Sequence, residues 1–559
     1  MPRPIPIGID DFRALREQGL EYVDKSHLVR EVLDKGAQIL LLPRPRRFGK
    51  TLNMTMLRCF FEKRAEDLSP LFEGLSIWQA GEAYRAHFQR YPVVFLTLKG
   101  IKLETFDLTW EVIKKRLSDL FGEHRALLDS GALSDEEALR YRQVLDGTAA
   151  HSVFGDALLD LSAYLHRAHG EKVVILIDEY DAPIHAGVAG GFLRQALDFF
   201  RLFLTQGLKG NPHLFKAVLT GILRIAKESV FSGLNNLAVY TLLRPEFSTC
   251  FGFTEPEVTA LLEQAGRGEL LSAVRGYYNG YSFGGTAIYN PWSILNFLQD
   301  RDARLRPYWV STSSNDLVHE ALRRHAFDLQ PEIEALLSGT AVEREIDENV
   351  VLSDLATRVD AVFGLLVFSG YLRAEEVPGT SLEIRPHSLS IPNREVRSVY
   401  TSTFRDLLRE QLGGDSAVDR LKRALLGGDA EGLEEELGAF TRNVLSYHDT
   451  AGRPEQVYHA FVIGLLATLE PSYEVRSNRE SGKGRPDVLV RPKQAGTPGA
   501  VLELKVARPG KKTLEEALAE GVAQIRERDY ASELRAAGAS PVHAFAVAFD
   551  GKVVRVVGV

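Results

Sequence analysis

The chain has 559 residues, of which 45% are hydrophobic and 25% are charged, and its formal net charge is -8. This length exceeds what one hydrophobic core organises, so we expect two to four domains of ordinary globular composition. The negative net charge excludes a protein that coats nucleic acid with uniform positive charge, so any nucleic-acid contact must come from local patches.

The two cysteines, Cys59 and Cys250, lie far apart in the sequence and form no CxxC pair. The sequence therefore indicates neither a disulfide framework nor a cysteine zinc site. The N-terminal residues lack the apolar stretch of a signal peptide, and the longest apolar runs are too short to span a bilayer. We expect a cytoplasmic protein without membrane contact.

Short apolar runs alternate with longer amphipathic stretches as far as about residue 240. The runs cover residues 38–42, 93–98, 173–177, 214–220 and 237–242. Continuous runs of valine, isoleucine and leucine are typical of parallel strands that helices cover on both faces. Residues 1–245 are therefore predicted to form an α/β domain built on a parallel sheet.

The segment after the first run has the pattern of a phosphate-binding loop. Residues 43–51 read Pro-Arg-Pro-Arg-Arg-Phe-Gly-Lys-Thr and lead into an amphipathic helix. Amide groups at the start of such a helix bind phosphate, and we place Gly49 at this turn. Lys50 is expected to reach the β- and γ-phosphates of ATP, and Thr51 to ligate Mg²⁺.

The loop departs from the standard pattern at its beginning. Arg44 stands where the first glycine is expected, and Pro45 removes one amide donor. Arg46 and Arg47 are expected to compensate by contacting phosphate directly. The alternative interpretation is a degenerate loop that binds nucleotide poorly or not at all.

A second pattern supports nucleotide binding. Residues 173–179 form an apolar strand that ends in two acids, and we expect Asp178 to hold Mg²⁺ and Glu179 to polarise the attacking water. If the strand that ends at Thr220 lies between the other two, Thr220 occupies a sensor position. Arg224 either contacts the γ-phosphate or forms a surface ion pair. Solvated acids that cap a strand are the alternative, but the order of both patterns favours an ATPase.

Residues 246–425 are predicted to form a mostly helical middle region. Thr254 and Glu257 have the spacing of a capping box at a helix start. A buried helix that ends at Gly370 is expected within residues 361–373. A short hairpin over 382–391 is expected to follow it, and this order permits a winged helix.

The last domain is predicted to cover residues 440–559, after a boundary in the Gly-, Asp- and Glu-rich residues 412–436. Its pattern is helix, strand, loop, strand, helix, strand and hairpin. The final hairpin is expected to turn at Asp550 and Gly551. This order predicts an α/β domain of the restriction-endonuclease-like class.

Three charged residues of this domain form a candidate metal site. Asp487 precedes a strand over 488–490, and the next strand carries Glu503 and Lys505 on one face because side chains alternate. Pairing of the two strands brings the carboxylates together, and such oxygen ligands suit Mg²⁺ or Mn²⁺. The metal would activate water, and Lys505 would orient it or stabilise developing charge. An amphipathic hairpin with three ordinary surface charges is the alternative.

Further residues are assigned supporting roles around these acids. Glu455, near the start of the preceding helix, is a candidate metal ligand. The other supporting candidates are Glu480, Arg485, Gln524 and Tyr530. Basic residues that include Arg476 and Lys512 suggest a rim for a phosphate backbone, and a solvated surface is the alternative.

Seven strings and one longer block extend these patterns over nearly the whole chain. They are residues 43–51, 177–183, 219–224, 232–236, 277–283, 289–293, 391–395 and 480–505. In these strings the chain resembles bacterial and archaeal proteins that join an AAA-ATPase-like domain to a PD-(D/E)XK nuclease domain. The resemblance implies ATP binding in the first domain and a nuclease fold in the last. It also implies that Arg44 is a family trait. The aromatic residues 277–283 fit a packed turn, with a base-stacking platform as the alternative.

Together these patterns predict an ATP-regulated, metal-dependent nuclease that uses ATP and Mg²⁺ or Mn²⁺. Its expected partner is nucleic acid, DNA foremost, and assembly into a homo-oligomer is expected from the resemblance. A regulatory ATPase switch or scaffold, whose last domain binds nucleic acid or protein without cutting, is the second hypothesis. A nucleotide-binding adaptor that does not hydrolyse ATP is the third.

Overall fold

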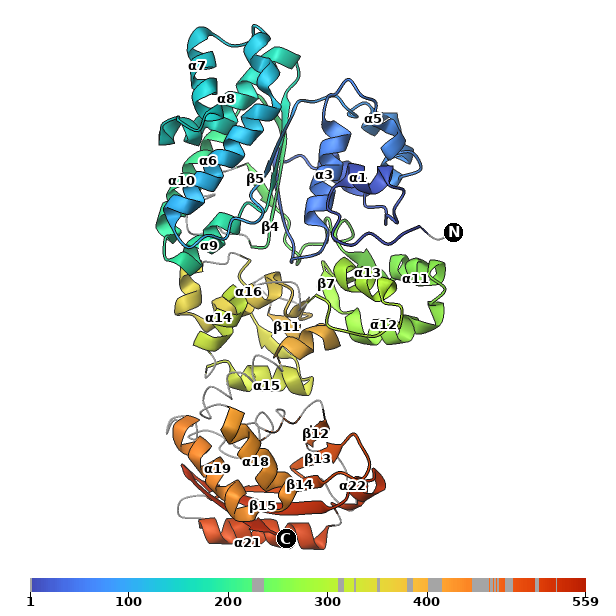
Figure 1. Ribbon diagram of the computed structural model, residues 1–559, viewed down its shortest axis with the longest axis vertical. Helices are drawn as coiled ribbons and strands as arrows, with labels where there is room; N and C mark the ends of the chain where they lie inside the picture. Colours follow the sequence, from blue (N-terminus) through green and yellow to red (C-terminus); the bar gives the residue numbers. More distant parts are fainter. Residues whose placement is uncertain are drawn as a thin grey trace. The chain divides into compact units, whose positions relative to one another are not determined.

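The structure, a computed structural model, divides the chain into two compact units (Figure 1). The first unit comprises Met1–His325 and Gly339–Arg397, and the second comprises Ala326–Ser338 and Ser398–Val559. The residues described are 3–223, 236–309, 316–325, 328–348, 352–379, 386–400, 415–444, 462, 466, 469, 472–477, 486–507, 512–528 and 530–559.

A five-stranded parallel sheet forms the core of the first unit. Its strands stand in the order β2, β3, β4, β1, β5, and every neighbouring pair is parallel. Their bounds are β1 Ile39–Pro43, β2 Val93–Thr97, β3 Val173–Asp178, β4 Leu214–Gly221 and β5 Leu237–Val239. All residues of β1 and β3 are buried, which explains their uninterrupted apolar sequence. The predicted parallel sheet is confirmed.

Helices cover both faces of this sheet (Figure 1). Those on one face are α6 Phe106–Glu123, α7 Asp135–Leu145, α8 His151–His169, α9 Ala182–Gly190 and α10 Leu193–Leu208. Those on the other are α1 Phe12–Glu17 and α3 Lys50–Phe61, with α2 His27–Asp34, α4 Ser76–Gln79 and α5 Glu82–Arg85 beside them. The longer helices, such as α3, α8 and α10, bury apolar residues, as a layered α/β fold requires.

The first unit continues with a small helical region around a three-stranded sheet. Its elements are β6 Phe253–Thr254, α11 Glu255–Gln264, α12 Leu271–Tyr278, β7 Tyr281–Phe283, β8 Thr286–Tyr289 and α13 Pro291–Gln299. The capping box at Thr254 and Glu257 is confirmed. Tyr278, Tyr281 and Phe283 are buried, so these aromatic residues form a packed turn and present no stacking platform for bases.

A second three-stranded sheet has the strand order β10, β11, β9 and is antiparallel. The elements of this region are α14 Asp316–Arg324, β9 Val342–Arg344, α16 Val359–Phe368, β10 Arg373–Glu376 and β11 His387–Ser390, whereas α15 Gln330–Ser338 belongs to the second unit. A helix followed by a hairpin, with a third strand from upstream, is the order expected for a winged helix. However, α16 is buried from Val362 to Phe368, so this helix has no free face for a DNA groove.

The hairpin after α16 begins earlier than the sequence suggested. We expected its first strand at 382–384, but the strand that pairs with β11 is β10, directly after the helix. Gly370, in a left-handed conformation (φ 85°), ends the helical segment and allows this close reversal. Residues 380–385, which include the expected strand, lie outside the described part of the chain.

Two strings that the sequence singled out meet in a buried contact. Glu395 is fully buried and accepts hydrogen bonds from the Ser293 hydroxyl at 2.8 Å and the Trp309 amide at 2.7 Å. Burial raises the pKa of Glu395 to about 7, although both hydrogen bonds oppose the shift. The contact therefore joins α13 to the chain after β11 through a carboxyl group that is held in an unfavourable environment for its charge.

We expect Glu395→Gln to flatten the pH dependence of stability. The carboxyl group binds its proton more tightly in the folded protein, so the free energy of unfolding falls as the pH rises from about 4.5 to about 7. The amide of glutamine does not titrate and therefore avoids this loss of stability, which amounts to about 3 kcal/mol above pH 7. All four tryptophans, Trp78, Trp110, Trp292 and Trp309, lie in the first unit, so unfolding followed by tryptophan fluorescence measures this effect.

Glu343→Gln is the matched control, because it makes the same change at an exposed glutamate of the first unit. Identical pH profiles for the wild type and Glu395→Gln would contradict the expectation.

The second unit contains a five-stranded sheet in sequence order, β12 Tyr473–Ser477, β13 Val488–Pro492, β14 Gly499–Val506, β15 Val542–Asp550 and β16 Val553–Gly558. All its neighbouring pairs are antiparallel except β14 and β15, which the helix α21 Leu514–Glu527 connects. Figure 1 shows α21 on one face and α18 Asp415–Gly427 and α19 Ala430–Val444 on the other. The short α22 is Ser532–Ala536. The predicted final hairpin is confirmed.

The helices α18 and α19 occupy the segment in which we placed the last domain boundary. Both pack against the sheet of the second unit. The three-part division at residues 245, 425 and 440 stays a prediction. Among the described residues, no helix combines the length and the apolar character that a bilayer crossing requires.

Candidate functional site

The loop between β1 and α3 has the geometry of a phosphate-binding loop. The strand ends at Pro43, and Gly49 precedes the helix in a left-handed conformation (φ 84°). Lys50 is 6% exposed, and its Nζ donates to the carbonyl oxygens of Arg44 and Pro45 at 2.9 Å each. Burial lowers the pKa of Lys50, and the nearby carboxylates of Glu179 and Asp178 oppose the shift. A phosphate at the amides of the helix start would add a further negative charge beside the ammonium group.

Arg44, at the position of the missing first glycine, has a structural role. Its side chain is fully buried, and its guanidinium donates to the carbonyl oxygens of Tyr240 and Phe247 at 2.7 and 3.2 Å. It also lies over the ring of Phe251, and burial lowers its pKa to about 10. The side chain of the arginine therefore links the end of β1 to residues 240–251, and glycine has no side chain to make these contacts.

Restoring the standard glycine by Arg44→Gly is therefore expected to destabilise the first unit. The change leaves two buried carbonyl oxygens without their donor and opens a cavity, which costs about 3 kcal/mol or more. Urea unfolding followed by tryptophan fluorescence measures the loss. Arg47→Gly in the same loop is the control, because Arg47 is exposed, and its change should stay within about 1 kcal/mol. Equal stability of the two variants would remove the structural role of Arg44.

The other two arginines of the loop lie at its outer side. The guanidinium of Arg47 lies 4.3 Å from the centre of the Trp292 ring. Arg46 lines a small cavity together with His185 and Tyr371. Their expected contacts with phosphate stay predictions.

Asp178, at the end of β3, is fully buried. Its Oδ2 accepts a hydrogen bond from the Thr51 hydroxyl at 2.8 Å, and its Oδ1 accepts one from the Thr220 hydroxyl at 2.8 Å. This arrangement arises because β4 lies between β1 and β3, which is the condition under which Thr220 was expected to be a sensor. The alternative of solvated acids that cap a strand is wrong for Asp178.

Glu179 follows at the same edge of the sheet. Its backbone is left-handed (φ 53°), a conformation that costs about 1–3 kcal/mol in a residue with a side chain and that clusters at functional sites. Burial raises the pKa of Glu179, and the nearby Lys50 opposes the shift. The pair Asp178 and Glu179 thus offers one carboxylate for a cation beside Thr51 and a second carboxylate next to it.

Tyr180 and Asp181 complete this edge, and the sequence analysis missed their role. The Asp181 carboxylate accepts hydrogen bonds from the amides of Ile222 and Leu223 at 2.7 and 3.0 Å. The Tyr180 hydroxyl donates to the Leu223 carbonyl oxygen at 2.6 Å. Both contacts need Gly221, because a Cβ there would lie 2.7 Å from Asp181 Oδ1. The string Asp-Glu-Tyr-Asp was the available signal. Arg224 lies outside the described residues.

The second candidate site lies on β13 and β14. Val488 pairs with Leu502, so Asp487 and Glu503 face each other one step further along the hairpin. Asp487 Oδ2 accepts from the Leu504 amide at 2.8 Å, and Lys505 Nζ donates to Glu503 Oε1 at 2.7 Å. The structure thus brings together the three residues that the alternation along the strand predicted.

Glu503 is 1% exposed, so the hairpin is not an ordinary charged surface. Its Oε2 is buried, and the described residues offer it no hydrogen-bond partner. Burial raises the pKa of Glu503, and the neighbouring Asp487 charge adds to the shift, whereas Lys505 opposes it. A buried oxygen without a partner, next to a second carboxylate, fits the hard-oxygen ligand set of Mg²⁺ or Mn²⁺.

The supporting residues differ in how far the structure describes them. Gln524, on α21, donates to the Tyr530 hydroxyl at 2.9 Å. Burial raises the pKa of Tyr530, and the charges of Glu503 and Asp487 contribute, so the phenol lies within electrostatic reach of both carboxylates. Three other candidates, Glu455, Glu480 and Arg485, lie outside the described residues.

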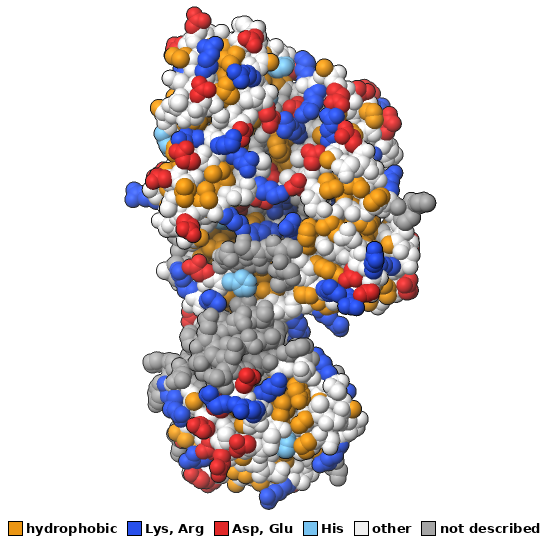
Figure 2. Space-filling view, in the orientation of Figure 1, with side chains coloured by type: hydrophobic (Ala, Val, Ile, Leu, Met, Phe, Trp, Pro, Cys, Tyr) orange, Lys and Arg blue, Asp and Glu red, His pale blue; other side chains and the backbone are white. Residues whose placement is uncertain are grey.

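The predicted basic rim is neutralised where the structure describes it. Arg476 pairs with Glu474 and Glu533 at 2.9 and 2.6 Å, and Lys512 pairs with Glu520. Figure 2 likewise shows acidic and basic side chains next to each other on the visible face of this unit. Both rim residues that the structure describes therefore have acidic partners, and a basic rim for a phosphate backbone stays a prediction.

Comparison with known proteins agrees with this division into two sites. Residues 6–231 match the family described as "Predicted AAA-ATPase", and residues 453–558 match the PD-(D/E)XK nuclease superfamily. The chain is also similar to the protein of Azotobacter chroococcum mcd 1 described as "Uncharacterized protein in vnfD 5'region". The identity is 28% over 571 residues, which cover 100% of this chain and 98% of that protein.

Proposed function

Since the chain joins an AAA-ATPase-like domain to a domain of the PD-(D/E)XK nuclease superfamily, we propose that it is an ATPase coupled to a nuclease. The last domain would cut phosphodiester bonds of nucleic acid with Mg²⁺ or Mn²⁺. The observation that carries the proposal is the buried Glu503 Oε2, which has no hydrogen-bond partner among the described residues and lies beside Asp487 and Lys505. Such an oxygen is costly unless a ligand completes its environment.

At the nuclease site, Asp487 and Glu503 would hold the divalent ion. A bound ion would lower the pKa of a water ligand and shield the scissile phosphate. Lys505, now hydrogen-bonded to Glu503, would shift toward the phosphate and stabilise the charge that develops on its oxygens. Tyr530 and Gln524, which share a hydrogen bond, would help to position Lys505.

At the nucleotide site, Lys50 would leave the two loop carbonyls for the β- and γ-phosphates of ATP. Thr51 and Asp178, which already share a hydrogen bond, would hold Mg²⁺. Glu179 would accept the proton of the attacking water, and its raised pKa brings it closer to the value of an effective base. Thr220 would keep Asp178 in place.

ATP binding would regulate cleavage in the other domain, with DNA as the foremost substrate and a homo-oligomer as the working assembly. A second candidate is a regulatory ATPase whose last domain binds nucleic acid or protein without cutting. The ion pair between Lys505 and Glu503 and the neutralised rim of Arg476 and Lys512 favour this candidate. Both candidates share the ATPase site.

The two candidates separate in one experiment. The purified protein is incubated with single- and double-stranded DNA and RNA, with and without ATP, in Mg²⁺, Mn²⁺ or chelator. We expect cleavage products that require the metal and change in amount with ATP. ATP hydrolysis without nucleic-acid cleavage in any of the metals would support the regulatory ATPase instead.

A further inference from the structure

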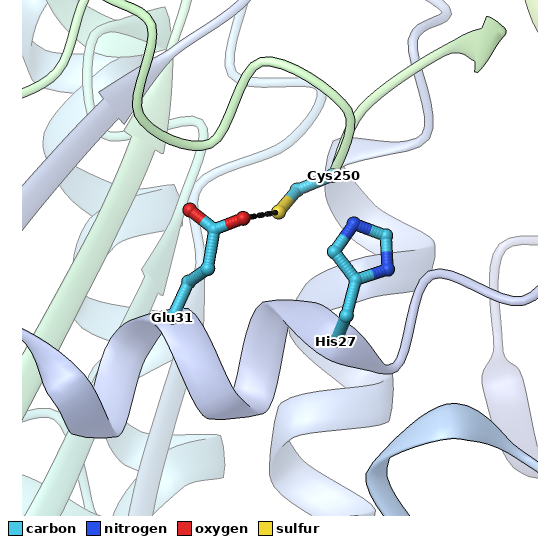
Figure 3. Close-up of side chains that lie close together, drawn as sticks. All are labelled: His27, Glu31 and Cys250. Atoms are coloured by element: carbon cyan, nitrogen blue, oxygen red, sulfur yellow. Dashed lines mark hydrogen bonds between the residues drawn. The ribbon is translucent and has the colours of Figure 1, made fainter. Parts of the chain in front are cut away.

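A third cluster of metal-ligating side chains lies away from both sites, on α2 and the segment before β6. His27 and Glu31 stand four residues apart and therefore share one face of α2. Cys250 reaches them from the other segment (Figure 3). One ligand atom of each residue lies within 4.8 Å of the others, and Cys250 Sγ lies 3.3 Å from Glu31 Oε1.

We propose that His27, Glu31 and Cys250 bind a transition-metal ion of the Zn²⁺ class. One nitrogen, one oxygen and one sulfur ligand suit this borderline-soft ion, whereas Mg²⁺ and Ca²⁺ prefer oxygen alone. Tetrahedral coordination at bond lengths of about 2.0–2.3 Å separates ligand atoms by roughly 3–4 Å. The spacing of the cluster allows such a site after small side-chain adjustments.

The neighbouring charges are compatible with a cation. Two positive groups lie near the cluster, and each already has its own partners. Lys25 pairs with Glu257 at 2.7 Å, and Arg44 is held by carbonyl oxygens, including that of Phe247. Binding would break the S–H bond of Cys250 and release its proton to solvent. The resulting thiolate and the Glu31 carboxylate together balance the two charges of the ion, and no oxidation is involved.

The ion would connect α2 to the segment that supports the phosphate-binding loop. The Cys250 carbonyl oxygen accepts from the Asn53 side chain at 2.8 Å, and Asn53 lies in α3. The Gly252 amide donates to the Phe48 carbonyl oxygen of the loop at 3.1 Å. Glu31 Oε2 accepts from the Phe247 amide at 2.8 Å in addition. Metal binding would therefore stabilise the first unit without contacting nucleotide.

Titration of the full-length protein with Co²⁺ tests this site directly. A cobalt–thiolate bond gives a charge-transfer absorption band that carboxylate sites cannot give, so only a cysteine site contributes. We expect the band to saturate at one ion per chain and Zn²⁺ to abolish it by displacement. The band should disappear in Cys250→Ser and persist in Cys59→Ser, which changes the only other cysteine.

A second variant keeps the test decisive if Cys250→Ser does not fold. His27 is only partly buried, so His27→Gln is expected to fold and to weaken Co²⁺ binding at least about 10-fold. A wild-type protein without the band, a band that survives in Cys250→Ser, or unchanged affinity in His27→Gln would overturn the proposal. None of these outcomes depends on ATP turnover or nucleic-acid cleavage.

Discussion

Asp487→Asn is expected to abolish metal-dependent cleavage of nucleic acid while ATP binding survives. The carboxylate is one of two that would hold the ion, and its loss removes several kcal/mol of stabilisation, or about 10³-fold in rate. Lys505→Ala is expected to lower the rate by about 10²–10³-fold, because it removes the positive charge beside the scissile phosphate. The measurement is the initial rate of product formation in Mn²⁺ at saturating substrate.

Matched controls come from the same sheet. Asp550→Asn changes an exposed carboxylate at the end of β15, and Lys493→Ala changes an exposed lysine after β13. Both should cut at the wild-type rate. Intact cleavage by Asp487→Asn or Lys505→Ala would show that this hairpin does not hold the reacting metal. If the wild type does not cut, the test instead supports the regulatory ATPase.

The second large effect is expected at the nucleotide site, where one substitution should weaken ATP binding and another should slow ATP hydrolysis. Lys50→Ala removes a charge-assisted contact with phosphate and should weaken ATP binding by about 10–100-fold. Glu179→Gln keeps the shape of the side chain but removes the base, so turnover should fall by about 10²–10⁴-fold with little change in affinity. Calorimetric binding and phosphate release measure the two quantities.

Lys63→Ala and Glu111→Gln are suitable controls, because both side chains are exposed on the same domain. Normal turnover in Glu179→Gln would contradict the assignment of the base. Retained biological function in Glu179→Gln, with loss in Lys50→Ala, would instead identify an adaptor that needs bound nucleotide but not hydrolysis.

The two sites differ in how far apart their residues lie in the sequence. Lys50 and Thr51 begin the helix that follows β1 after a short loop, and Glu503 and Lys505 lie two residues apart on one strand. Asp487 lies opposite Glu503, directly before the neighbouring strand of the same hairpin. These placements follow from the alternation of side chains along a strand and the orientation of amides at a helix start. They were therefore predictable from sequence.

The nucleotide site also contains contacts that no local pattern carries. Thr220 meets Asp178 only because β4 lies between β1 and β3. Asp181 was missed because its partners, Ile222 and Leu223, are backbone amides of another strand end. In the sequence Arg44 is a departure from the standard loop, and only the structure shows the carbonyl oxygens to which its side chain donates hydrogen bonds.

The sequence by itself determined the strands of the parallel sheet, the turn at Gly49, the acids at strand ends and the hairpin that carries Asp487 and Glu503. Only the tertiary structure decided the order of the strands, the burial of Arg44 and the meeting of Cys250 with Glu31, which are 219 residues apart. The physical reason is that periodicity and turn chemistry act within a few residues. Pairing of distant segments depends instead on which buried surfaces fit together, and this depends on the whole chain.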